Sequence, residues 1–138
     1  MNAEAAIAWL GYARENLPTA QWAFQNGLLN PSLQKALQAV EKALKAVWVF
    51  RGQTVRKTHS IADLVEDLAA AGADVGSTLA QCHLLDSVYL PSKYPVESVL
   101  PERPVDTAAA GQCVGLAEQV CAWAAGKIAG PGRPWRWR

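Results

Sequence analysis

Apolar residues recur every three or four positions along most of the chain, which is the spacing of one face of an α-helix. No segment alternates apolar and polar residues for long enough to form a strand. The pattern predicts helices over residues 3–28, 31–51, 61–71, 76–90 and 105–128. We therefore expect an all-α fold, an up-and-down bundle of about five helices.

Residues that start or stop helices stand at the borders of the first two segments. Pro18 lies inside the first segment and removes one backbone donor, so we expect a kink or a break there. Gly27 ends this helix, and Asn30 followed by Pro31 is typical of an N-cap and a first helical position. Gly52 fits the position just after the second helix.

The third and last helices also have marked borders. Ser60 and Asp63 resemble a capping box at the start of the third helix, and Gly72 ends that helix. Prolines recur between residues 91 and 104, which predicts an irregular loop before the last helix.

The second helix has one apolar side and one polar side. The opposite side from its leucines and valines carries charged and amide residues, namely Gln34, Lys35, Gln38, Glu41, Lys42 and Lys45. We expect this side to face solvent, with Glu41 and Lys45 as a favourable i,i+4 pair. The alternative is that both reach toward the loop at 57–59 and shape a polar cleft there.

The composition describes a folded single domain, because 51% of the residues are hydrophobic and 18% are charged. Alanine, a strong helix former, is the most frequent residue, with 25 of 138. The net charge of +1 provides no overall field toward nucleic acid or a membrane, and no apolar run reaches the roughly 18 residues of a membrane-spanning helix. We assign residues 1–129 to the bundle and 130–138 to a tail rich in arginine and tryptophan.

The tail has side chains that can stack on bases, since it ends Trp135-Arg136-Trp137-Arg138. Because the segment is so short, we favour docking of the tail on protein over binding to nucleic acid. Nucleic acid is therefore not an expected partner. The first residues carry no basic cluster of a signal peptide, and the three cysteines form no C-x-x-C pair. Both features indicate the reducing cytoplasm.

Few residues indicate a catalytic, metal or cofactor site. Cys113 and Cys121 lie on the apolar side of the last helix, where they act as small hydrophobic residues. We find no nucleophile–base pairing, phosphate-binding loop or ligand spacing for a metal, so we expect neither a metal nor a cofactor.

The tryptophans are expected to pack in the core or at an interface, and four of them follow helical spacing: Trp9, Trp22, Trp48 and Trp123. Six tryptophans and 51% hydrophobic residues give more apolar surface than one small core needs. Two-fold dimers are the commonest oligomers. We therefore expect a homodimer.

Three motifs follow one another along the chain. Residues 38–46 read QAVEKALKA, residues 58–64 read THSIADL, and residues 92–95 read SKYP. In this order and spacing they resemble the HEPN family, a helical domain associated with nucleotidyltransferases. The resemblance covers about residues 3–128.

The resemblance implies a helical bundle and a connection to nucleotides or to a separately encoded minimal nucleotidyltransferase. Such pairs work in toxin–antitoxin-like or nucleotide-signalling systems. Ribonuclease members carry an arginine followed, after four to six residues, by a histidine, and no arginine here has a histidine at that distance. We therefore expect a non-catalytic module; the alternatives are a divergent ribonuclease toxin and a structural helical adaptor.

A candidate phosphate site combines the motif residues with the loop before the third helix. Its members are Lys57, His59, Lys93, Tyr94, Glu41 and Lys45. His59 titrates near neutrality and stands where a helix N-terminus favours an anion, although residues 58–60 would serve equally to organise the loop and cap the helix. Lys93 replaces the family's arginine and offers a point charge instead of a fork. The expectation is weak binding of a nucleoside triphosphate.

Overall fold

The computed structural model describes residues 3–55, 57–58, 60–73, 75 and 106–129. These residues form four α-helices and no strand: α1 (Ala3–Gln25), α2 (Leu29–Phe50), α3 (Ile61–Ala70) and α5 (Thr107–Ala129). The predicted all-α class is confirmed. The further helix expected at 76–90 and the tail at 130–138 lie outside the described residues, so four helices are described where about five were expected. None of the described helices is both long and apolar enough to cross a bilayer.

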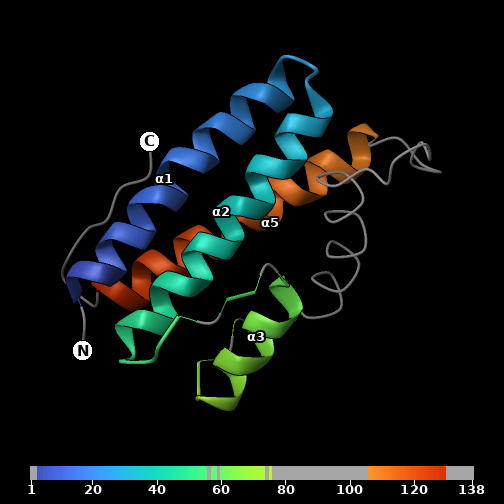
Figure 1. Cartoon of the computed structure of the whole chain (residues 1–138). Coiled ribbons are helices and arrows are strands. Elements are labelled where there is room, and N and C mark those ends of the chain that lie inside the picture. Colours follow the sequence, from blue (N-terminus) through green and yellow to red (C-terminus); the bar gives the residue numbers. More distant parts are fainter. Residues whose placement is uncertain (1–2, 56, 59, 74, 76–105, 130–138) are drawn as a thin grey trace.

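The helix α2 is the centre of the bundle. It forms a hairpin with α1, its most extensive packing partner, while α5 lies behind both and α3 covers the C-terminal half of α2 (Figure 1). More than half of the residues of α2 are buried as a result. The core consists of large side chains such as Leu10, Leu37 and Leu44, filled out by many alanines. Small alanine side chains allow these helices to approach one another closely.

Three helices end in the same way, as the glycine pattern predicts. At the end of α1 the Gly27 N–H donates to the carbonyl of Phe24 (3.2 Å), and the Leu28 N–H donates to that of Ala23 (2.8 Å). This pair of bonds is a Schellman motif, which requires positive φ at the glycine. The same bonds close α2 and α3, and the three glycines have positive φ: Gly27 (74°), Gly52 (83°) and Gly72 (89°).

The predicted start of α2 is wrong. The N-cap is Leu28, whose carbonyl accepts from the Ser32 N–H at 3.0 Å, and no side chain caps the helix. The turn between α1 and α2 is so short that Leu28 serves both helices, because its N–H also closes α1. Asn30 and Pro31 therefore fall inside the first turn of α2, where a missing donor costs little.

Of the kink or break expected at Pro18, the break does not occur, because α1 runs through this residue without interruption (Figure 1). Leu17 and Ala20 on either side are buried in the core. Tertiary packing therefore holds the helix together across the missing backbone donor. The Thr19 hydroxyl donates to the carbonyl of Glu15 at 2.9 Å in the same turn.

The predicted cap of α3 is confirmed. The Ser60 hydroxyl accepts from the Asp63 N–H at 3.2 Å, which satisfies one of the free donors at the helix start. An aspartate does the same for α5, since the Asp106 carboxylate accepts from the Ala109 N–H at 2.7 Å. The last helix thus begins at Thr107, and the predicted first residue, Val105, is outside the described part.

Candidate functional site

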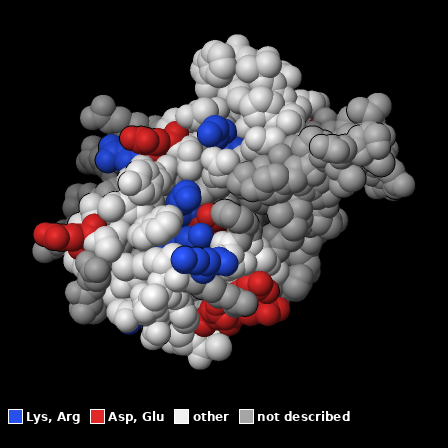
Figure 2. Space-filling view, viewed as in Figure 1, with Lys and Arg blue, Asp and Glu red and all other residues white. Residues whose placement is uncertain are grey.

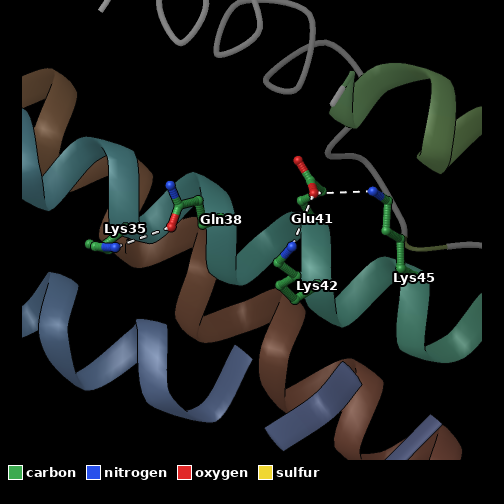
Figure 3. A network of polar contacts seen from close by, with 5 residues as sticks. All are labelled: Lys35, Gln38, Glu41, Lys42 and Lys45. Carbon is green, nitrogen blue, oxygen red and sulfur yellow. Dashed lines mark hydrogen bonds and ion pairs between the residues drawn. The ribbon is translucent and has the colours of Figure 1, made fainter. Parts of the chain in front are cut away.

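A cluster of charged side chains lies on α2 within the motif of residues 38–46. The Glu41 carboxylate lies 3.1 Å from the Lys45 ammonium and 3.6 Å from that of Lys42 (Figure 3). Glu41 is only 2% exposed and Lys45 only 5% exposed. The prediction that both side chains face solvent is therefore wrong.

The central position of α2 explains this burial. A helical wheel of α2 alone shows a polar side, but α1, α3 and α5 all pack on this helix. Charged groups that leave water must be paired, and the 3.1 Å contact between Glu41 and Lys45 provides that pairing. Nearer the start of the helix, Lys35 donates to the side-chain oxygen of Gln38 at 3.4 Å and is only half-buried (Figure 3).

An indole ring from α1 completes the cluster. The ring centroid of Trp9 lies 5.1 Å from the Lys42 ammonium and 5.6 Å from that of Lys45. The Tyr12 ring packs edge-on against the Trp9 ring, with centroids 6.2 Å apart. We call Trp9, Glu41, Lys42 and Lys45 the charge cluster. Its ion pairs lie within α2, and the contacts of both lysines with Trp9 tie α1 to α2 by cation–π attraction.

Sequence reasoning missed Trp9 as a partner of the lysines. Trp9 and the lysines lie on different helices, and only the register of the α1–α2 hairpin brings them together. Helical spacing of an aromatic residue indicates core packing and says nothing of a cation beside the ring. Trp9 is indeed partly buried against the core, as are Trp48 and Trp123.

The charge cluster is mostly buried. It holds two cations and one carboxylate, and its only partly exposed charged member is Lys42, with 29% of the side chain exposed. In the view of Figure 2, several basic side chains gather near the centre, one group of acidic side chains lies over α3, and further acidic side chains lie at the left of the view. Lys45, being buried, offers no surface to a large ligand; Lys42 at the edge does.

The predicted phosphate site is described only in part. Glu41 and Lys45 form the buried pair given above, and Lys57 is exposed on the loop that leads to α3. His59, Lys93 and Tyr94 lie outside the described residues. The Thr58 hydroxyl accepts from the Ser60 N–H at 3.0 Å, and the Ser60 hydroxyl accepts from the Asp63 N–H. The side chains of this loop thus engage backbone N–H groups that an anion would also use.

The two described cysteines are unreactive. Cys113 and Cys121 are fully buried on α5, and neither forms a disulfide. Burial raises the pKa of each thiol from 9.0 to about 12. The thiolate, which is the nucleophile and the metal ligand, is therefore scarce at neutral pH. Within the described part, no group of three or more histidine, cysteine or acidic residues is placed to hold a metal ion.

Three large side chains of α1 are exposed, namely Ile7, Tyr12 and Trp22. We call these three residues the outer face of α1. These three are 48%, 56% and 60% exposed. They lie away from the side of the helix that buries Leu10 and Leu17. Sequence reasoning placed Trp22 in a core or an interface, and its exposure excludes the core of this chain.

A shallow, open surface lies on the same helix. The described residues that line it all belong to α1, namely Gly11, Arg14, Glu15, Pro18 and Thr19. A Cβ at Gly11 would meet no atom within 4 Å, so this surface is open there. The exposed side of α1 therefore carries large apolar side chains and two opposite charges, Arg14 and Glu15.

Known proteins share this helical architecture. The family model of the HEPN domain matches residues 6–128. The solved structure of TT1696 from Thermus thermophilus is 32% identical, has a TM-score of 0.77, and is matched over 92% of this chain and 99% of that one. ST0689, described as an archaeal HEPN homologue, is 27% identical with a TM-score of 0.69, over 89% of this chain and 97% of that one. No protein with curated function matches.

The family match spans all four described helices and includes the motif that carries the charge cluster. The bundle, the motif order and the structural similarity to two solved proteins agree with one another. This chain belongs to the HEPN domain family.

Proposed function

We propose that this chain is a non-catalytic HEPN protein that acts as a protein-interaction module in the cytoplasm. The proposed partner is a separately encoded minimal nucleotidyltransferase, the kind of protein with which the family is associated. The observation that supports an interaction role is the outer face of α1. Three large side chains exposed on one helix offer a partner apolar surface to bury.

The absence of a catalytic pair supports the non-catalytic part of the proposal. No arginine in the sequence is followed by a histidine after four to six residues. The described basic residues of the motif, Lys42 and Lys45, are engaged by Glu41. Cleavage of RNA needs a group that deprotonates the ribose hydroxyl and a group that stabilises the charge on phosphate.

Co-expression with a nucleotidyltransferase encoded beside this chain tests the interaction. We expect the two proteins to co-purify, and the double variant Tyr12→Ser/Trp22→Ser to weaken the association at least tenfold, because aromatic side chains dominate interface energies. Gln119→Ser, at an exposed position on α5, is the matched control and leaves binding unchanged. Equal binding by the double variant contradicts the assignment of this face. Association of the chain only with itself favours the structural adaptor.

An RNA-cleavage assay tests the catalytic alternative. We expect no metal-independent cleavage of single-stranded RNA above background. Cleavage that disappears in His59→Ala would instead favour the divergent ribonuclease toxin.

Nucleotide binding is the second candidate function, and the exposed position of Lys57 near the start of α3 favours it. A phosphate contact by one or two lysines, set against ordering costs, allows binding only in roughly the micromolar-to-millimolar range. Titration with a nucleoside triphosphate by NMR is expected to shift signals around residue 57, and Lys57→Ala or Lys93→Ala to weaken the effect. Absence of shifts at millimolar nucleotide contradicts this candidate.

A further inference from the structure

A pocket of about 420 Å³ lies where the C-terminal ends of α2, α3 and α5 meet. We call it the C-terminal pocket; its lining includes Val47, Phe50, Arg51, Gln53, Ala73 and Lys127. Its volume is within the usual range of small-molecule sites, roughly 300–1,000 Å³. None of the residues of the predicted phosphate site is among the described lining residues.

The rim of the C-terminal pocket is cationic. Arg51 and Lys127 stand on the ends of two different helices, and Gln53 adds a neutral amide. No acidic side chain is among the described lining residues, and in that part of the chain neither cation forms an ion pair. Two cations and one amide along the same lining favour an anionic group in the pocket.

Arg51 is held in place by the end of α3. Its guanidinium donates to the carbonyl of Ala71, and it lies over Gly72, where an added Cβ would be 3.6 Å from the guanidinium nitrogen. Only one of the five N–H donors of the guanidinium is used in this bond. The remaining donors are therefore oriented in advance, which reduces the ordering cost of binding.

The floor of the C-terminal pocket is apolar. Val47 and Ala73 are buried side chains of the core, and Phe50 is half-buried beside them. A free inorganic ion would leave this surface in contact with water. A ligand that carries a compact apolar body beside its charge would cover it.

We propose that the C-terminal pocket binds a small organic anion. Its carboxylate or phosphate contacts Arg51 and Lys127, and its apolar body lies on Val47, Phe50 and Ala73. The site is independent of the proposed interaction through α1. The partial negative charges at the three helix ends oppose binding of an anion by the two cations, so the affinity is modest, in roughly the millimolar range.

Titration of the full-length protein with four probes tests the pocket by NMR. The probes are phenyl phosphate, benzoate, inorganic phosphate and benzyl alcohol. We expect phenyl phosphate, benzoate or both to shift the signals of residues 47–53, 73 and 127, and added salt to weaken binding. If only one of the two aromatic anions binds, the result identifies whether the pocket prefers a phosphate or a carboxylate. Inorganic phosphate and benzyl alcohol are expected to bind at least fivefold more weakly, because each lacks one half of the interaction.

Two lysine variants separate this pocket from the predicted phosphate site. Lys127→Gln, at an exposed position, is expected to weaken binding of the aromatic anion at least threefold, whereas Lys57→Gln leaves it unchanged. The proposal is overturned by an unchanged affinity in Lys127→Gln or by inorganic phosphate binding as tightly as phenyl phosphate. It is also overturned if neither aromatic anion causes shifts at about 20 mM, because a site of roughly millimolar affinity would be mostly occupied at that concentration.

Discussion

Replacing Glu41 by glutamine removes the carboxylate that pairs with two lysines of the charge cluster. At 3.1 Å and an effective dielectric constant of about 20, the attraction between Glu41 and Lys45 is roughly 5 kcal/mol before desolvation is counted. Removing one partner of a buried pair typically destabilises a protein by about 3–5 kcal/mol, because the other charge stays buried and uncompensated. The contacts of both lysines with Trp9 are present in the parent and in the variant, so they do not enter this difference. We expect Glu41→Gln to lower the free energy of unfolding by about 3 kcal/mol.

Urea denaturation followed by far-UV circular dichroism measures this change, with unchanged m-values as evidence that the unfolded state is comparable. Lys42→Gln is the control. Its ammonium is 3.6 Å from the carboxylate and partly exposed, so its removal is expected to cost about 1 kcal/mol or less. A loss in Glu41→Gln no larger than in Lys42→Gln would refute the structural role of the carboxylate.

A double-mutant cycle isolates the pair itself. In Glu41→Gln/Lys45→Met no buried charge is left at either position, so the double variant is expected to be more stable than the sum of the single losses implies, by about 2–3 kcal/mol. Additivity within about 0.5 kcal/mol would show that the two charges do not act on one another.

Three further predictions concern a cap, the thiols and the assembly. Ser60→Ala is expected to cost about 0.5–2 kcal/mol of unfolding free energy, and Ser60→Asp to retain most of it, because aspartate also caps; equal losses in the two variants would contradict the cap. In the unfolded chain the thiols of Cys113 and Cys121 ionise with a pKa near 9.0, whereas in the folded chain burial raises the pKa to about 12 and keeps them protonated. The thiols therefore lower the unfolding free energy as pH rises through this window, by about 1.4 kcal/mol per pH unit for each thiol, and Cys113→Ala/Cys121→Ala is expected to reduce the slope by that amount; a slope in this variant as steep as that of the parent refutes the assignment to the thiols. Light scattering at micromolar concentration is expected to give twice the chain mass of 14.8 kDa, and a value near 14.8 kDa would contradict the homodimer.

Helix ends were predictable because they depend on local chemistry. Glycines in positive φ at 27, 52 and 72, and the hydroxyl of Ser60, act within five residues of their own position. The N-cap predicted at Asn30 was wrong because the start of α2 does not depend on local chemistry alone. Asparagine is a good N-cap residue, but the turn between α1 and α2 is shorter than expected, so the helix begins at Leu29. The length of this turn depends on how α1 packs against α2.

The burial of Glu41 and Lys45 was not predictable from the periodicity of α2. A helical wheel divides one helix into sides but contains no information on how many neighbours cover it. Three helices cover α2, so both of its sides are partly interior. The motifs at residues 38–46, 58–64 and 92–95 together identified the family correctly, whereas the location of Trp9 beside the lysines of the first motif follows only from the tertiary register.

The short turn shared by α1 and α2 has a consequence for the order in which the chain folds. Contacts between segments close in sequence need the least loop-closure entropy, so this hairpin can assemble early and while later residues are still being synthesised. The helix α5 begins at Thr107, far along the chain from the end of α2 at Phe50, and its docking joins segments that are distant in sequence. The sulfur of Cys121 reaches the carbonyl of Ala39 on α2 (4.0 Å) only after that step. Protection of the α5 thiols from a labelling reagent during refolding thus marks the moment at which the bundle closes.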